Sequence, residues 1–406
     1  MLPNCTNGTH IKRKFSIETL QHLIILFFVF EPRLLTTDTK FHVIATLIRM
    51  ILLLGMLAVQ IKGKCSPKVV LACVPYYVVL FYSCNINGTS FVDQIPDMLV
   101  IFCVISFSSL QLIRDARRYI YELYILSWCL LIINASYMFF NPWDDSFLAY
   151  GFLGGKNDFG PIAICIVLIA SINYLLVDKA RQKRNCIALV ALTGIECFWL
   201  GSTTGVIGYL LCICLMILVM QFSIKGNIFM PALFIYLGLF LSVVVFQVQN
   251  YFASTIYNIT GKEVSFTGRS AIWKRAIEKI KNQFWLGYGK SEVITTQHER
   301  TGEISIWAAH NGIMDLIIVG GILLLIAYCF YCFVCVAHAE KNRSLVSQMC
   351  VVAWFAYSVM LLVEYYEMSR YYILIMVLLY YSNYIMDKVN SGGKLAHGAD
   401  CIYTDV

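Results

Sequence analysis

The chain has 406 residues, of which 59% are hydrophobic and only 14% are charged. A soluble domain carries about a quarter charged residues and just under half apolar ones, so this composition excludes an ordinary soluble globular domain. The formal net charge is +7, but much of the excess lies in short loops between apolar blocks. The sequence contains no nucleic-acid-binding motif, and we therefore expect no nucleic-acid partner.

The apolar residues form long blocks rather than alternating with polar ones. Backbone groups inside a bilayer must pair with one another, which leaves helices or a closed barrel, and barrel strands would alternate at a period of two. We therefore predict an all-α polytopic membrane protein, with residues 1–406 forming one integral membrane domain in the lipid bilayer. About twelve spans are long enough to count. They are residues 16–30, 41–61, 69–84, 98–113, 119–140, 161–177, 187–200, 205–222, 228–248, 312–336, 345–363 and 371–385.

Basic residues alternate along the short loops and predict the orientation of the spans. They precede the first span and follow the second, fourth, sixth, eighth, tenth and twelfth, whereas the intervening short loops carry few of them. The positive-inside rule then places both termini in the cytoplasm and the long segment 250–305 outside. No cleavage site of small residues follows Lys14, so we interpret the first apolar run as a span that is kept.

Most of the sixteen cysteines lie within apolar runs. Cys329, Cys332 and Cys335 recur every three residues, which resembles a metal-binding pattern. However, they lie in an unbroken apolar run that lacks the turn of a zinc knuckle. Buried cysteine behaves as a small hydrophobic residue, so we interpret these positions as core packing and predict no metal site.

The segments predicted to face outward hold most of the distinctive polar residues. The first is residues 141–160, which end in a glycine-rich run around Asn157. The second is the tight turn at 202–204, followed by the large extracytoplasmic loop 250–305 between the ninth and tenth spans, and by residues 364–370. We expect any chemistry to take place at this boundary between membrane and water.

Residues 267–280 predict an amphipathic helix within the large loop. Ile272, Trp273 and Ala276 share one face with Arg269, while Arg275 belongs to the basic face. A basic amphipathic helix of this kind can simply lie on a membrane surface. Arg269 departs from that interpretation because it projects from the apolar face in the first helical turn, where free N–H groups favour an anion. It is a candidate for binding phosphate or for pairing with a carboxylate.

Two further groups of residues follow this helix. Tyr288 lies in a glycine-punctuated aromatic turn, where aromatic rings either anchor the chain at the interface or stack on sugar rings. His310 and Asn311 begin the tenth span, and a neutral imidazole there can accept a proton from an attacking hydroxyl. Asp315 lies inside that span, where a carboxylate needs a polar cavity or a partner. Arg49, near the middle of the second span, is the other prominent charge in the membrane, and the sequence leaves open whether the two pair.

The order of these motifs resembles the O-antigen ligase and polymerase superfamily of bacterial membrane enzymes. The resemblance covers the topology of the whole chain and the motifs from about residue 150 to 325. The motifs that carry the resemblance are the run 151–160, Gly268-Arg269-Ser270 with Trp273, Leu286-Gly287-Tyr288-Gly289, His310-Asn311-Gly312 and Gly320-Gly321. Two departures stand out. Thr204 stands where the family often has a diphosphate-binding arginine, and the proline common before the Gly-x-Gly turn is missing.

The resemblance implies glycosyl transfer on the outer face of a bacterial plasma membrane, from a glycan carried on a polyprenyl diphosphate. Arg269 would stabilise the leaving diphosphate, and His310 would act as general base or position the acceptor. Neither a cofactor nor a metal is required, although the outward acids Asp144, Asp145 and Glu31 leave a metal-dependent relative as a less favoured alternative. Flippase and chain-length regulator proteins are the implied partners. The other substrate-binding candidates are Arg275, Asn311, Asp315, Tyr288, Asn157 and Thr204, with Lys290 and Arg300 as further cations.

Three functions remain open at this stage. The favoured one is polymerisation of repeat units of a capsule, exopolysaccharide or O-antigen. The second is a ligase that transfers finished glycan from the same carrier to a lipid or protein. The family's ligase pattern is met by Gly321 but not by Leu324, which favours the polymerase. The third is a lipid-linked glycan transporter without catalysis, which would need more polar residues near the middle of several spans.

Overall fold

The computed structural model describes residues 17–36, 39–62, 68–142, 150–222, 226–248, 251, 269–290, 294–297, 304–341, 343–366 and 368–390. Its helices are α1 (Ile17–Val29), α2 (Arg33–Thr36), α3 (Thr39–Lys62), α4 (Lys68–Ile86), η1 (Val92–Gln94), α5 (Ile95–Phe140), α6 (Phe159–Leu176), α7 (Ala180–Leu200), α8 (Thr203–Phe222), α9 (Phe229–Leu239), the π-helical turn η3 (Phe240–Val245), α11 (Arg269–Asn282), α12 (Gly312–Glu340), α13 (Leu345–Met360), α14 (Arg370–Tyr380) and α15 (Ser382–Asn390). Two short antiparallel pairs complete it, β1 (Tyr150–Gly151) with β2 (Gly154–Gly155) and β3 (Ile294–Gln297) with β4 (Ile304–Trp307).

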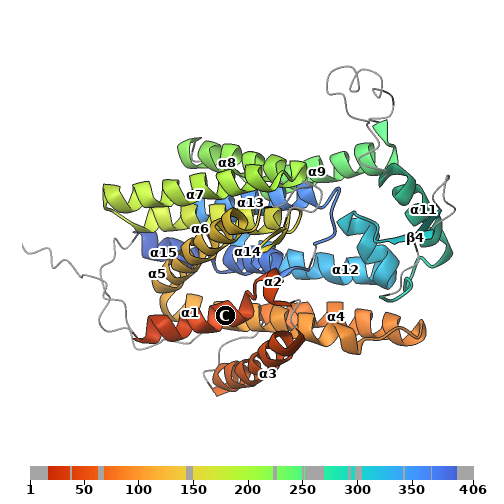
Figure 1. The fold of residues 1–406 in the computed structure, drawn as a ribbon, viewed down its shortest axis with the longest axis horizontal. Helices are drawn as coiled ribbons and strands as arrows, with labels where there is room; N and C mark the ends of the chain where they lie inside the picture. Colours follow the sequence, from red (N-terminus) through yellow and green to blue (C-terminus); the bar gives the residue numbers. More distant parts are fainter. Residues whose placement is uncertain are drawn as a thin grey trace, which may run out of the picture.

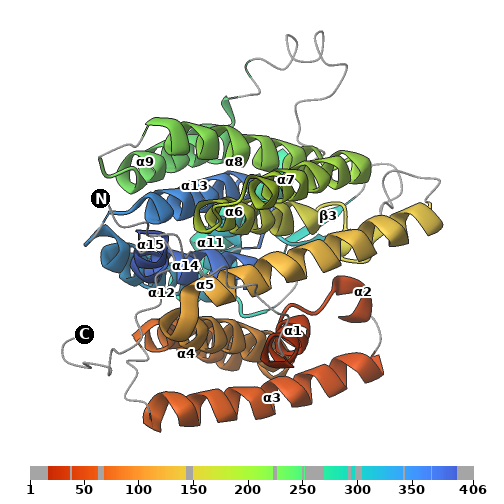
Figure 2. The same ribbon diagram turned by 90° about the vertical axis from the view of Figure 1, so that its left-hand side faces the viewer.

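The helices are arranged in layers, with α7, α8 and α9 along the top of Figure 1, α6, α13 and α14 in the middle, and α1, α3 and α4 below. Figure 2 shows the same order from the side. Helix α14 lies at the centre and contacts α5, α6, α12, α13 and α15. Its residues from Tyr372 to Tyr380 are all buried and are apolar on every side, as expected for a helix surrounded by other helices.

Every apolar segment predicted to span the membrane is helical. Among the described residues, six helices are long and apolar enough to cross a membrane by length and composition, and four shorter apolar helices accompany them. These observations support an all-α membrane protein, while the count of twelve spans remains a prediction. The peripheral helix α3 exposes large apolar side chains such as Ile51 and Leu54, which gives the molecule a surface suited to lipid tails.

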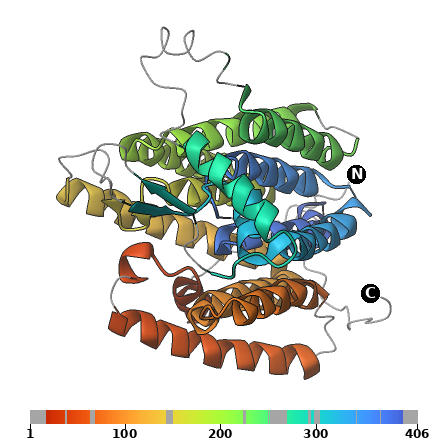
Figure 3. The ribbon, with the colours of Figure 1, turned by 90° about the vertical axis from the view of Figure 1, so that its right-hand side faces the viewer.

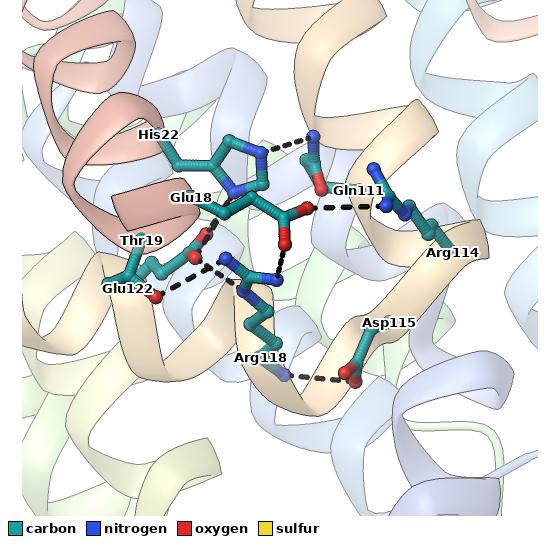
Figure 4. Close-up of polar contacts among 8 residues, drawn as sticks. All are labelled: Glu18, Thr19, His22, Gln111, Arg114, Asp115, Arg118 and Glu122. Atoms are coloured by element: carbon teal, nitrogen blue, oxygen red, sulfur yellow. Dashed lines mark hydrogen bonds and ion pairs between the residues drawn. The ribbon is translucent and has the colours of Figure 1, made fainter. Parts of the chain in front are cut away.

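Two predicted spans are joined in α5, whose regular geometry breaks at Asp115 (φ −154°, ψ 85°), inside the basic segment predicted as a loop. Figure 4 shows the polar network that holds this break against α1. The Nε of Arg118 donates to Glu122 (2.9 Å) and its Nη1 donates to Glu18 (2.6 Å). The buried Glu122 also lies 2.9 Å from Nδ1 of His22. The network satisfies its buried charges within itself and fixes α1 to the turn of α5.

Helix α12 is also interrupted, at Gly320 and Gly321, where Gly321 has φ 67°. The turn after α11 fills the break, since the N–H groups of Tyr288 and Gly289 donate to the carbonyls of Ile318 (2.7 Å) and Val319 (2.9 Å). The turn thus gives backbone partners to carbonyls at a break in the helical hydrogen-bond pattern.

Ser83 of α4 closes the junction from the other side. Its hydroxyl donates toward the carbonyls of Leu286 (2.6 Å) and Val319 (2.7 Å), and it accepts from the N–H of Gly289 (3.1 Å). A Cβ on Gly287, which has φ 62°, would collide with the carbonyl of Ile318. The glycines of this motif are therefore needed because two backbones approach closely.

The amphipathic helix predicted in the large loop is present as α11. Figure 3 shows it crossing in front of the helix layers, with the β3–β4 pair beside it. Its apolar face buries Ile272, Trp273 and Ala276 against Met314 and Ile318 of α12. Thr267 and Gly268, predicted to begin this helix, lie outside the described residues, as does most of the segment before them.

Candidate functional site

A buried carboxylate joins the two residues that the sequence predicts to be catalytic. Glu364, in the loop between α13 and α14, is only 2% exposed. Its Oε1 accepts from Nη2 of Arg269 at 2.8 Å, and its Oε2 lies 3.9 Å from Nδ1 of His310. The first contact is a charge-assisted hydrogen bond, whereas the second is an ion-pair distance too long for a hydrogen bond. Arg269 therefore makes the carboxylate contact that the sequence left open.

The position of His310 follows from the way α12 begins. The side chain of Asn311 caps the helix by accepting from the N–H of Met314 (3.0 Å), and its Nδ2 donates to the carbonyl of Leu362 (3.0 Å). The N–H of Gly312 donates to the carbonyl of Leu361 (2.8 Å). These bonds tie the start of α12 to the end of α13 and hold His310 opposite Glu364, with φ 47° in the left-handed region.

Helix α11 positions Arg269, its first residue, beside Glu364. Trp273 is fully buried, and with Ile272 and Ala276 it packs the helix onto the first turns of α12. Arg269 lies on this side of the helix at its first position, and its side chain remains 16% exposed. The guanidinium is therefore held beside Glu364 while part of it reaches solvent.

Asp315 lies one turn into α12, and its Oδ1 accepts from the N–H of Ala309 (3.1 Å). This bond fixes the residue that precedes His310, so Asp315 shapes the approach to the imidazole. Lys290 and His310 both interact electrostatically with Asp315. Lys290 is exposed and is the cation that acts on Asp315.

The remaining predicted residues lie elsewhere. The hydroxyl of Tyr288 donates to the carbonyl of Lys279 (3.1 Å), which ties the aromatic turn to the end of α11. Arg275 is exposed on the basic face of the same helix. Asn157 accepts from the hydroxyl of Ser202 (3.2 Å), which also caps the start of α8 next to Thr204 by accepting from the N–H of Gly205. Asn157 and Thr204 thus lie at the junction of α6 and α8.

Arg49 does not pair with Asp315. Its Nη2 forms a buried ion pair with Glu31, its Nε donates to the carbonyl of Phe28 (2.9 Å), and Nη1 of Arg370 donates to the carbonyl of Glu31 (2.9 Å). Glu31, predicted only to be an outward acid, is buried in the structure with 2% exposure. Within the described ranges, no group of three or more His, Cys, Asp or Glu side chains is arranged to hold a metal.

Taken together, the fold is that of a helical membrane protein with a polar cluster where α11, α12 and the α13–α14 loop meet. Residues 188–329 match the sequence model of a family described as O-antigen ligase. This segment is about a third of the chain and contains Arg269, Tyr288, His310 and Gly321. The match supports the O-antigen ligase and polymerase superfamily, as the motifs predict. No curated protein matches the chain.

The matched family consists of glycosyltransferase-like ligases and polymerases, and it indicates a function of this general type. Glu364 lies beyond the matched segment and was not among the candidates predicted from the sequence. Only its place in a loop predicted to face outward, beside an apolar span, distinguished it. An acid there could equally have been a solvated loop residue, because nothing local to it signals the distant Arg269.

Proposed function

We propose that the protein polymerises the repeat units of a capsule, exopolysaccharide or O-antigen on the outer face of a bacterial plasma membrane. The donor is a glycan on a polyprenyl diphosphate, and both termini of the protein lie in the cytoplasm. The observation that carries the proposal is the bridge of Glu364 between Arg269 and His310. It combines a cation suited to a diphosphate with a base suited to a hydroxyl in one small site.

In the proposed reaction, an acceptor hydroxyl oxygen attacks the anomeric carbon of the donor sugar. The bond between that carbon and the diphosphate oxygen breaks, and the diphosphate leaves with the electron pair. The hydroxyl proton passes to Nε2 of His310, because Nδ1 faces Glu364. The carboxylate then stabilises the imidazolium, in the way that an acid supports the base of a catalytic triad. A single displacement of this kind inverts the anomeric configuration.

Arg269 would stabilise the leaving diphosphate as charge develops on it. The hydrogen bond to Glu364 comes from Nη2. A guanidinium has five N–H donors, so Arg269 can bind the carboxylate and a diphosphate at the same time. Because Thr204 replaces the arginine that the family often has, a second cation is needed. Lys290 acts electrostatically on Asp315, close to His310, and is the favoured candidate for that role. Arg275 is less favoured because it lies exposed on the basic face of α11.

A ligase of the same chemistry is the second candidate, because the matched family is described as O-antigen ligase. The surface glycan of a deletion strain separates the two. A polymerase predicts single capped repeat units in that strain, whereas a ligase predicts long glycan that remains on the carrier. Wild-type chain length should return with the intact gene but not with the His310→Ala variant. Unchanged glycan in the deletion strain would contradict both.

A further inference from the structure

A pair of stacked tyrosine rings, one exposed and one partly buried, lies directly beside the proposed base. Tyr365 is 42% exposed, and its ring stacks on that of Tyr366 with centroids 5.7 Å apart and an angle of 18°. The rings of Tyr365 and His310 also meet in a T-shaped contact, with centroids 5.3 Å apart and an angle of 78°. A molecule that rests on this pair from the solvent side would therefore lie next to the imidazole.

Charged groups from two other segments act electrostatically on the pair. Arg33, exposed at the start of α2, interacts electrostatically with both tyrosines and with Tyr150 of β1. Asp158, just before α6, also acts on both rings, and its Oδ2 accepts from the N–H of Gly155 (2.9 Å). Three separate parts of the chain thus contribute to one surface.

The backbone fixes these parts relative to one another. The N–H of Leu34 donates to the carbonyl of Phe152 (3.2 Å), which joins α2 to the β1–β2 hairpin. Arg370 at the start of α14 donates to the carbonyl of Glu31, just ahead of α2. The buried pair of Arg49 and Glu31 holds the same corner from inside. These contacts hold the segments that form the surface in fixed positions relative to one another.

Both hydroxyls of the pair are kept protonated. Burial, reinforced by Asp315, Glu364 and Asp158 and opposed by Arg33, raises the pKa of Tyr365. Burial together with Glu364, Asp158 and Tyr365 raises the pKa of Tyr366 in the same way. A protonated phenol both donates and accepts a hydrogen bond, so each ring presents a flat apolar face and a polar tip.

This combination suits a sugar, which has an apolar C–H face and a rim of hydroxyl groups. The rings offer the flat surface, the Asp158 carboxylate accepts from hydroxyl groups, and the Arg33 guanidinium donates to them. A simple interfacial anchor would use the rings but would not need the carboxylate beside them.

We propose that Tyr365 and Tyr366, with Arg33 and Asp158, form the subsite that binds the acceptor sugar. This inference rests on the proposed glycosyl transfer, because it assigns the acceptor to the His310 side of Glu364 and the donor diphosphate to the Arg269 side. The attacking hydroxyl then reaches the imidazole from the aromatic platform. Residues in this subsite are expected to affect the affinity for the acceptor more than the rate of the chemical step.

The test uses the full chain in lipid nanodiscs and a defined probe, the repeat-unit oligosaccharide released by partial acid hydrolysis from the source cell's own glycan. Its binding is measured by saturation-transfer NMR for the wild type and for Tyr365→Ala, Tyr365→Phe and Arg33→Ala. Loss of the ring is expected to weaken binding about tenfold or more, because stacking and the hydroxyl contact are both lost. Tyr365→Phe should retain part of the affinity.

Tyr82, a 54% exposed tyrosine on α4, provides the matched control as Tyr82→Ala, which should bind like the wild type. In elongation assays, Tyr365→Ala should raise KM for the acceptor, whereas His310→Ala should lower kcat. If the wild-type protein elongates glycan but Tyr365→Ala binds the oligosaccharide as tightly as the wild type does, the proposed subsite is wrong. The tyrosine pair would then be an interfacial anchor. A wild type that cannot elongate at all would instead overturn the proposed function.

Discussion

Glu364 is the residue on which the site depends, because it contacts a cation and an imidazole at once. Because Glu364 is buried, removing either the carboxylate or its cationic partner would leave an uncompensated charge inside the protein. Arg269 begins α11 inside the large loop, His310 directly precedes α12, and Glu364 follows α13. The carboxylate therefore holds together groups that are far apart along the chain.

The Glu364→Gln variant should keep the shape of this residue but lose its charge. We expect elongation to slow by about ten- to a thousandfold, because the imidazolium loses its counter-charge and Arg269 loses its orientation. The initial rate with purified protein measures this loss. Glu364→Asp should recover part of the rate, and a Gln variant as fast as the wild type would remove the carboxylate from the mechanism.

Arg269 and Arg275 belong to the same helix and form an internal comparison. Arg269→Ala should reduce elongation strongly and raise KM for the lipid-linked donor, because the diphosphate loses its paired cation. Arg275→Ala should cost much less, since that side chain is exposed on the opposite face. Equal losses for the two variants would show that the basic character of α11 matters and not the position of Arg269.

At the scale of elements, the junction between α12 and the turn after α11 is the most constrained part of the fold. Gly287→Ala would place a methyl group against the carbonyl of Ile318 in a left-handed conformation. We expect a loss of unfolding free energy of about 1 kcal/mol or more. Unfolding by denaturant in detergent micelles measures it. The control is Gly55→Ala on α3, where a Cβ meets nothing within 4 Å, so this change should be neutral or stabilising.

The amphipathic phase of α11 could be predicted from the sequence because Ile272, Trp273 and Ala276 recur with the helical period. The break in α12 could not, since Gly320 and Gly321 sit in an apolar run and the turn that repairs it comes from a distant segment. The pairing of Arg49 with Glu31 could not be predicted from the sequence either, because it depends on how the chain reverses direction between α1 and α3. The site residues that α11 and α12 bring near Glu364 were suggested by their motifs, but the carboxylate between them was not.

For the whole molecule, the central claim about orientation rests on the alternation of basic loops. A fluorescent-protein fusion after Asn390 should fluoresce, because we expect that end in the cytoplasm. An alkaline phosphatase fusion at Lys281 should be active, because we expect α11 outside. The opposite pattern at both positions would place the site in the cytoplasm, and the account of an extracytoplasmic donor would then be wrong.

The most direct test of the account is elongation by the purified full chain in proteoliposomes supplied with polyprenyl-diphosphate-linked repeat units. The proposed polymerase mechanism predicts a ladder of longer lipid-linked glycans for the wild type, release of polyprenyl diphosphate, and an inverted configuration at each new linkage. It also predicts that folded His310→Ala protein gives no ladder. A His310→Ala ladder equal to that of the wild type would contradict the proposed mechanism. Movement of lipid-linked glycan across the bilayer without any elongation would show a transporter instead.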